Sequence, residues 1–205
     1  MGYPVVFIHG MWCTGAHWKR VTDLMGPRGY DCHALTLPGH EPTSDQPITV
    51  GPLSLKSYLT YIEDYIARQN FKQPPIIIGH SMGGLLAQQL AARTRPLALV
   101  LLTPAPPAGI LALSWTNIMA FWRVLLKWAG WRKPHKPDFE KTQAYVFNTV
   151  PVEQHRAGFE SMVHESGRVV YEIGLWPLDL GCASEVDATA VRCPVYVVSA
   201  EKDKL

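Results

Sequence analysis

Five short apolar runs restrict the fold of this chain more than any other feature of its sequence. Each run has four to seven residues, and none shows the polar alternation expected of a strand with one face in water. Runs of this kind are typical of strands that are buried on both faces of a parallel sheet. They occupy Pro4–Ile8, Cys32–Leu37, Ile76–Gly79, Leu97–Thr103 and Val195–Ser199.

Amphipathic segments separate these runs. Between Leu55 and Ile66 the apolar side chains recur at helical spacing, and Ser54 is placed to cap the first turn. A second helix is expected after Ser81, in the stretch MGGLLAQQLAAR. Parallel strands that alternate with helices are joined by right-handed crossovers. The sequence therefore predicts an α/β fold with a doubly wound, mostly parallel sheet.

The alternation stops after Pro104. From residue 106 to residue 182 no further run of the buried-strand type occurs, several prolines interrupt the chain and aromatic residues are frequent. We interpret this segment as a helical cap inserted into the sheet domain. The predicted core is therefore discontinuous and comprises residues 1–105 and 183–205. The tryptophans of the insertion are Trp115, Trp122, Trp128, Trp131 and Trp176.

Composition places the chain among globular proteins. Its 205 residues suit one domain, 47% of them are hydrophobic and 18% are charged. A net charge of +2 without a basic and aromatic cluster gives no sign of a nucleic-acid partner. No apolar stretch approaches the ~20 residues of a membrane helix, and the N-terminus lacks the basic region of a signal peptide. We expect a cytoplasmic protein without a membrane partner, with reduced cysteines and with an oligomeric state that the sequence does not indicate.

Ser81 lies between glycines at positions 79 and 83, in the pattern G-x-S-x-G, directly after the third apolar run. Between a strand and a helix this pattern predicts a sharp turn, in which side chains at the flanking positions would clash. The turn lifts the hydroxyl above the C-terminal edge of the sheet, where open α/β sheets bind ligands. We interpret Ser81 as a nucleophile; the alternative is an ordinary serine in a glycine-rich turn.

An oxyanion that develops beside Ser81 requires two N–H donors. We expect the first from Met82, at the start of the following helix. The second is expected from the loop after the first apolar run, with Met11 as the donor and Trp12 beside it. His9, in the same loop, is interpreted as a structural residue that braces the turn.

Five segments resemble the α/β-hydrolase family, in its serine-hydrolase branch of esterases and lipases. They are VVFIHGMW, LTLPGHE, IIIGHSMGGLLAQQLA, LVLLTPAP and CPVYVVSAEKD, and in order and spacing they span nearly the whole chain outside the insertion. The resemblance implies a lid formed by the insertion and a catalytic triad in the chain order Ser–acid–His. It also implies that Ser81 is the nucleophile and Asp203 the acid, with Glu201 as a nearby rival.

The base of that triad is the member that the sequence does not supply. The resemblance implies a histidine beyond the acid, whereas two residues follow Asp203 and all eight histidines precede it. His80 adjoins Ser81, but neighbouring side chains on such a turn diverge. We therefore expect a C-terminally truncated hydrolase of impaired activity, which lacks the last strand, the histidine loop and the final helix. A histidine of the insertion that swings over Ser81 is the alternative.

A serine nucleophile favours acyl transfer. We expect hydrolysis of carboxylic esters or related acyl substrates through an acyl-enzyme on Ser81. The aromatic insertion suits an apolar acyl or aromatic group, and the candidate pocket residues are Trp12, His80, Trp115 and Trp122. Since metal-ligand spacing and phosphate-binding glycine loops are absent, we expect no metal and no cofactor. Two alternatives stay open, a non-catalytic binder of small molecules and a lyase or cofactor-free haloperoxidase on the same fold.

Overall fold

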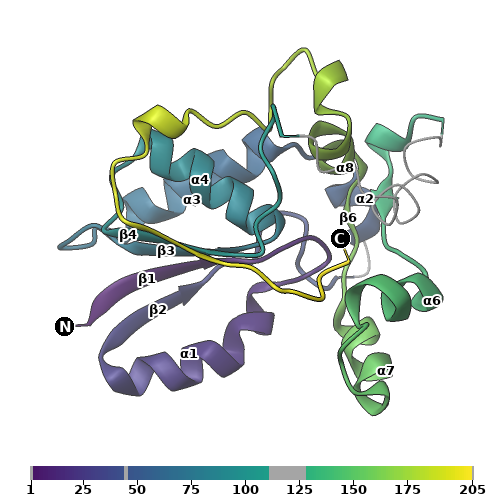
Figure 1. Cartoon of the computed structure of the whole chain (residues 1–205), viewed down its shortest axis with the longest axis horizontal. Coiled ribbons are helices and arrows are strands. Elements are labelled where there is room, and N and C mark those ends of the chain that lie inside the picture. Colours follow the sequence, from purple (N-terminus) through teal and green to yellow (C-terminus); the bar gives the residue numbers. More distant parts are fainter. Residues whose placement is uncertain (1, 44–45, 111–127, 205) are drawn as a thin grey trace.

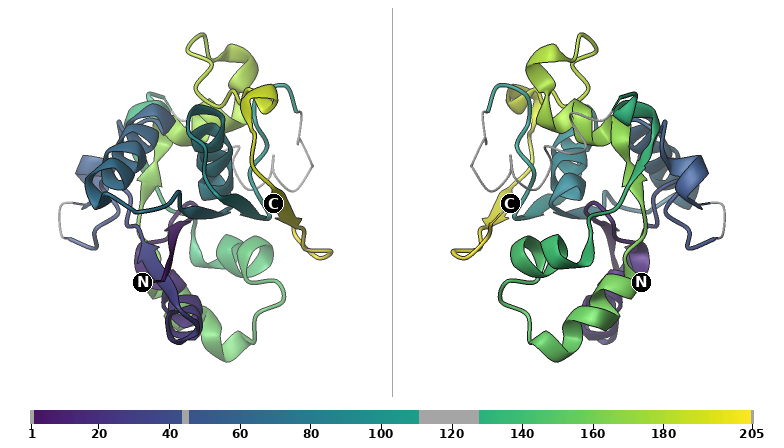
Figure 2. Two further views of the ribbon diagram at one scale, coloured as in Figure 1. Left: turned by 90° about the vertical axis from the view of Figure 1, so that its left-hand side faces the viewer. Right: turned by 90° about the vertical axis from the view of Figure 1, so that its right-hand side faces the viewer.

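A computed structural model describes residues 2–43, 46–110 and 128–204 of the chain (Figure 1). Its centre is a parallel sheet of five strands in the order β2-β1-β3-β4-β7. Both views of Figure 2 place the C-terminal strand (yellow) at the outer edge of the sheet, away from the N-terminal strands (purple). The strands are β1 (Tyr3–Ile8), β2 (Tyr30–Ala34), β3 (Ile76–His80), β4 (Ala98–Leu102) and β7 (Val195–Val198).

Helices cover both faces of this sheet. α3 (Leu55–Gln69) and α4 (Met82–Arg93) lie on one face, and α1 (Lys19–Met25) lies on the other (Figure 1). The predicted doubly wound α/β architecture is thus confirmed. The remaining elements of this part are short: α2 (Gln46–Val50) and the 3₁₀ turns η1 (Gly15–Trp18), η2 (Gly26–Arg28) and η6 (Ala188–Ala190).

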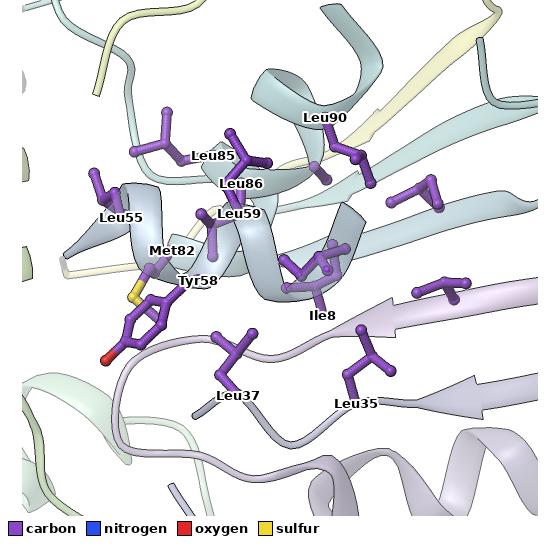
Figure 3. Close-up of a cluster of buried hydrophobic side chains, with 14 of the residues drawn as sticks. Ile8, Leu35, Leu37, Leu55, Tyr58, Leu59, Met82, Leu85, Leu86 and Leu90 are labelled. Carbon is purple, nitrogen blue, oxygen red and sulfur yellow. The ribbon is translucent and has the colours of Figure 1, made fainter. Parts of the chain in front are cut away.

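The main hydrophobic core lies between the sheet and the α3–α4 layer. Helix α3 begins where predicted, because the Ser54 hydroxyl accepts a hydrogen bond from the Ser57 N–H and the Ser57 side chain caps Ser54 in return. One face of the helix is buried, as its apolar spacing indicates. Figure 3 shows this core, which includes Ile8, Leu35, Leu37, Leu55, Tyr58, Leu59, Met82, Leu85, Leu86 and Leu90.

The expectation that all five strands are buried on both faces is wrong for the outer strands. β1 is buried nearly throughout, whereas β3 and β4 alternate between buried and partly exposed residues. β2 is partly exposed at one edge of the sheet. The four side chains of β7, at the other edge, are 39–67% exposed. In this chain, an apolar run in an edge strand therefore does not indicate that both faces of the strand are buried.

The segment predicted as a helical insertion is mainly helical where it is described, from residue 128 to residue 182. Its unpredicted feature is a small antiparallel sheet, in which β5 (Pro134–His135) pairs with β6 (Glu165–Ser166). The division of the chain into core and cap stays a prediction, and Trp115 and Trp122 lie outside the described residues. The helical elements are η3 (Gly130–Arg132), α6 (Phe139–Lys141), the π-helix η4 (Thr142–Val146), α7 (Val152–Ser161), α8 (Gly167–Gly174) and η5 (Trp176–Leu178).

The strand order determines where a ligand site is expected. The chain runs outward from β1 to β2 on one side, and from β3 to β4 and β7 on the other. The order therefore reverses between β1 and β3, and open α/β sheets bind ligands outside the carboxyl ends of strands at such a point. The two segments that leave this point are the loop after β1 and the turn before α4. No helix in the described ranges is both long and apolar enough to cross a lipid bilayer.

Candidate active site

Ser81 occupies the single-residue turn between β3 and α4. Its backbone has φ 52° and ψ −122°, a conformation that side-chain-bearing residues rarely adopt and that costs on the order of 1–3 kcal/mol. Hydrogen bonds hold it from both sides, from Ser81 N–H to Leu102 O at 3.1 Å and from the Ala105 N–H to Ser81 O at 2.9 Å. The hydroxyl makes no capping bond to α4. The side chain is therefore not used as a helix cap, the usual role of a serine at this position.

The glycines around Ser81 are required by close backbone contacts. A methyl group at Gly79 would come within 2.3 Å of Gly83 O, and one at Gly83 within 2.3 Å of Ile8 O. A methyl group at Gly84 would lie 2.7 Å from Pro104 Cβ. These distances agree with the expectation that only glycine fits beside this turn.

The loop after β1 packs directly against the turn. A methyl group at Gly10 would lie 3.0 Å from Ser81 Cβ, so that this loop and the serine are in contact. Gly10 O accepts hydrogen bonds from His9 Nδ1 at 2.9 Å and from Cys13 N–H at 3.3 Å. Because carbonyl and N–H point in opposite directions across a trans peptide, these bonds turn the Met11 N–H away from the loop interior. Neither Met11 nor Met82 donates its N–H to a backbone carbonyl in the described ranges.

His9 braces this loop, in agreement with its interpretation as a structural residue. The ring is 1% exposed, and its Nε2 accepts a hydrogen bond from the Leu37 N–H at 3.0 Å. Nδ1 then carries the proton that is donated to Gly10 O. Burial, together with the charges of nearby histidines such as His40, lowers the pKa of His9 to about 3. The ring is therefore neutral at neutral pH and joins β1 to the segment after β2.

Asp203 and His80 lie near each other at the same end of the sheet. Desolvation lowers the pKa of His80, and the negative charge of Asp203 offsets part of this effect. The Asp203 side chain is exposed, in a turn closed by a 3.2 Å hydrogen bond from its N–H to Ala200 O. Two bonds tie this turn to the insertion, from Asn148 Nδ2 to Lys202 O at 2.9 Å and from Lys204 Nζ to Ala144 O at 3.2 Å.

The other predicted pocket residue in the described ranges is Trp12. Its ring is buried and meets the ring of His135 edge-on, with 6.0 Å between centroids. Its carbonyl accepts a hydrogen bond from the Val163 N–H at 2.9 Å, so that the loop after β1 is joined to the insertion. Within the described part of the chain, no group of three His, Cys, Asp or Glu side chains is arranged to hold a metal ion.

One buried polar cluster behind this site is not predicted from the sequence. Glu165, at the start of β6, accepts hydrogen bonds from His40 Nε2 at 3.0 Å and from the Tyr58 hydroxyl at 2.8 Å. Neither a role for Glu165 nor its pairing with His40 follows from the sequence. The two residues are 125 positions apart, and no local pattern in the sequence links them.

Solved structures similar to this chain share its fold. One is an extracellular alpha/beta-hydrolase from a Paenibacillus species, with a TM-score of 0.68 and 18% identity over 82% of this chain and 69% of that chain. A variant of tomato methylketone synthase I complexed with beta-ketoheptanoate has a TM-score of 0.71 and 16% identity. That match covers 99% of this chain and 81% of the synthase chain. A methylesterase protein from Arabidopsis has a TM-score of 0.69 and 13% identity, over 99% of this chain and 80% of the methylesterase chain.

Sequence comparison leads to the same group of proteins. A protein of Mycoplasma pneumoniae named "Putative esterase/lipase 2" is 34% identical over 101 residues. The aligned region covers 48% of this chain and spans 37% of the length of that relative. The model of the family described as "Alpha/beta hydrolase family" matches residues 5–205. This chain therefore belongs to the alpha/beta hydrolase family.

Proposed function

We propose that this protein is a serine hydrolase that cleaves carboxylic esters or related acyl compounds, with Ser81 as its nucleophile. The observation that carries this role is the strained backbone of Ser81, whose hydroxyl is kept away from the helix that it would otherwise cap. Such strain persists only where the surroundings hold the residue, as the glycine contacts and the bonds to Leu102 and Ala105 do.

In the proposed reaction, Ser81 Oγ attacks the carbonyl carbon of the ester while a base takes the hydroxyl proton. The N–H groups of Met11 and Met82 bind the resulting oxyanion. The bond to the alcohol then breaks, and the base returns the proton to the departing oxygen. Water attacks the acyl-serine in the same way, which releases the acid and restores Ser81. We assign Asp203 as the carboxylate that orients the base.

The substrate is proposed to carry an apolar acyl or aromatic group. Trp12 and His80 adjoin the turn and the loop after β1, and an apolar substrate group suits such a lining. Trp115 and Trp122 belong to the same proposal, although they lie outside the described residues. The names of the Mycoplasma and Arabidopsis relatives support an ester as the reacting group. All four cysteines are free thiols, which fits the cytoplasmic location that we propose.

Turnover of p-nitrophenyl butyrate by the wild type and by Ser81→Ala tests this function. Because the described contacts assign no base to Ser81, the assay is run with and without imidazole as an external base. We expect the wild type to exceed Ser81→Ala at every imidazole concentration, because only the wild type offers a hydroxyl that the ester can acylate. Imidazole itself cleaves such esters, and the Ser81→Ala reaction provides that background.

A mass measurement separates catalysis at Ser81 from catalysis elsewhere on the surface. After brief exposure to the ester and acid quenching, the peptide that contains Ser81 should carry one butyryl group in the wild type. The same peptide of Ser81→Ala should carry none. Equal turnover by the two proteins, together with an unmodified Ser81 peptide, would contradict the proposed function.

A further inference from the structure

Glu165 and His40 form an ion pair that is completely enclosed by protein, since both side chains are 0% exposed. His40 donates from Nε2 to Glu165 Oε2 at 3.0 Å and from Nδ1 to Pro38 O at 3.2 Å. A ring that donates from both nitrogens is an imidazolium. Desolvation acts against this charge, but the adjacent carboxylate outweighs it and raises the pKa of His40. Glu165 Oε1 also accepts from the Tyr58 hydroxyl at 2.8 Å and from the Ser166 N–H at 2.7 Å.

Stability alone does not account for an ion pair at this place. Removing two charges from water costs several kcal/mol per ion, and apolar side chains of similar volume often stabilise a protein as well or better. A buried pair with four hydrogen bonds does, however, restrict its partners to one arrangement. This cluster holds two groups of the sheet domain in place.

The first group that it holds is the loop that carries the Met11 N–H. The His40 ring packs against the His9 ring, with 4.9 Å between centroids. His9 in turn donates to Gly10 O, the carbonyl of the peptide that contains the Met11 N–H. A displacement of His40 would release the His9 ring and allow this peptide to rotate. The rings of His40 and His9 are thus the connection between Glu165 and the direction of the Met11 N–H.

The second group is the first turn of α4, which carries the Met82 N–H. Tyr58 is fully buried, and Figure 3 shows the Met82 side chain directed toward its ring. The Tyr58 hydroxyl is fixed by its bond to Glu165, so that the ring offers Met82 one position to pack against. The same carboxylate therefore supports both N–H groups that we assign to the oxyanion.

We propose that Glu165 is a positioning residue for the oxyanion site, acting through His40 and His9 on the Met11 amide and through Tyr58 on the Met82 amide. This inference rests on the proposed function, because the two amides matter for catalysis only if Ser81 is the nucleophile. Glu165 lies in the segment predicted to be the insertion, whereas the groups that it fixes lie in the part of the chain predicted to be the sheet domain. Seating of the insertion on the sheet thereby becomes a condition for a well-aligned site.

Glu172 supplies a matched control. It is also a buried glutamate of the insertion, and it also contacts the sheet domain, since it accepts from the Leu55 N–H at 2.8 Å. Arg168 Nε donates to its other oxygen at 2.8 Å. Glu172 thus attaches the insertion to the start of α3, through hydrogen bonds that involve no residue of the Glu165 cluster. A role limited to holding the insertion would affect both glutamates alike.

The kinetic test compares Glu165→Gln with Glu172→Gln in the p-nitrophenyl butyrate assay with imidazole. The amide introduced by Glu165→Gln keeps an acceptor for Tyr58 and removes the charge that faces His40. We expect Glu165→Gln to lower kcat about ten- to hundredfold and to leave KM within about twofold, because the alignment of the amides affects the transition state. Glu172→Gln should keep kcat. Equal losses of kcat in the two variants, or a loss confined to KM, would overturn the positioning role.

A second readout does not depend on turnover. Protein labelled with ¹⁵N-methionine reports directly on the two amides, since Met11 and Met82 are among six methionines of the chain. We expect Glu165→Gln to shift the Met11 and Met82 signals and to leave Met25, on the other face of the sheet, unchanged. Tyr58→Phe removes no charge and should shift Met82. Glu172→Gln should shift neither signal.

These outcomes separate the two proposals. If Ser81→Ala equals the wild type but the Met11 and Met82 signals still respond to Glu165 alone, the positioning role stands and the hydrolase assignment fails. If the wild type is active while Glu165→Gln moves neither signal nor kcat, the positioning role fails and the hydrolase assignment stands. If Glu165→Gln does not fold, Tyr58→Phe supplies the same comparison with a smaller loss of kcat.

Discussion

Among single residues, His9 occupies an environment that excludes its charged form. One ring nitrogen must accept from Leu37 N–H while the other donates to Gly10 O, and protonation would break the first of these bonds. Because the pKa of His9 is lowered to about 3 in the folded state, the free energy of unfolding depends on pH. In the unfolded chain His9 binds a proton below about pH 6.5, whereas in the folded chain it does not until about pH 3.

The stability of the protein should therefore fall as the pH is lowered from about 6.5. One proton bound only in the unfolded state costs about 1.4 kcal/mol per pH unit, which amounts to about 2 kcal/mol at about pH 5. Urea unfolding at neutral and at mildly acidic pH measures this difference in the free energy of unfolding. His9→Gln keeps one donor and one acceptor but cannot titrate, and its difference should be about 2 kcal/mol smaller. Carboxylates affect both proteins alike, so identical pH dependence in the two would refute the assignment to His9.

The contribution of His40 to stability changes with pH in the opposite direction. Its pKa is raised in the folded state, so its contribution is fully present below about pH 6.5 and is lost as the pH rises through the folded value. Two histidines whose rings touch thus limit stability from opposite ends of the pH scale. The neutral ring of His9 and the charged ring of His40 can lie in contact because the carboxylate of Glu165 stabilises the charge on His40.

At the scale of elements, Gln46 connects α2 to the insertion. Its side-chain amide donates to His164 O and to Gly39 O, each at 2.8 Å, while its oxygen accepts from the His164 N–H at 3.1 Å. The amide therefore pairs with the backbone next to β6 in the way that a neighbouring strand would. Gln46 is itself buried, so no water replaces it without rearrangement.

Gln46→Ala should lower the free energy of unfolding by about 1–3 kcal/mol, because it leaves the part-buried N–H and C=O of His164 without the side-chain amide that they contact. Thr49→Ala, in the same helix, removes a hydroxyl whose bond is to Gln46 O. It should cost less than about 0.5 kcal/mol. Chemical denaturation of both variants at neutral pH measures these two losses in the free energy of unfolding. Similar losses would mean that any change in helix α2 destabilises the protein, and that the hydrogen bonds of the Gln46 amide are not the cause.

Elements with a local sequence pattern are the ones that the sequence predicts well. The apolar runs locate β1, β3 and β4 closely, and the spacing around Ser54 locates the start of α3. The glycine pattern locates the turn at Ser81, since its steric requirement is met by adjacent residues. The β5–β6 pair and the Glu165 cluster have no such pattern, because their partners are brought together only by the fold. Burial of the outer strands is mispredicted for the same reason, as it depends on neighbours and not on composition.

At the scale of the whole molecule, β7 leaves one edge of the sheet open. Among the described residues its backbone pairs only with β4, and its side chains are exposed on both faces. An apolar edge of this kind is a template for pairing with another chain. In the described ranges the sheet ends at β7.

We predict that the protein associates as its concentration rises and that Tyr196→Lys reduces this association. Tyr196 is the most exposed side chain of β7, and a charge on an edge strand opposes further pairing. Leu24→Lys on α1 is the control, because Leu24 is also exposed and apolar but lies on a helix. Light scattering over a concentration series measures the effect. If both lysines reduce scattering equally, general solubility and not the sheet edge is the cause.

The contact between Gly83 and the end of β1 limits which substitutions the chain tolerates beside Ser81. It joins backbone to backbone, with no room for even one methyl group. The spacing between the Met82 and Met11 segments is therefore independent of side-chain size, and most substitutions leave it as it is. A side chain at Gly83 would instead force these two segments apart, because the atom that it would meet is a backbone oxygen.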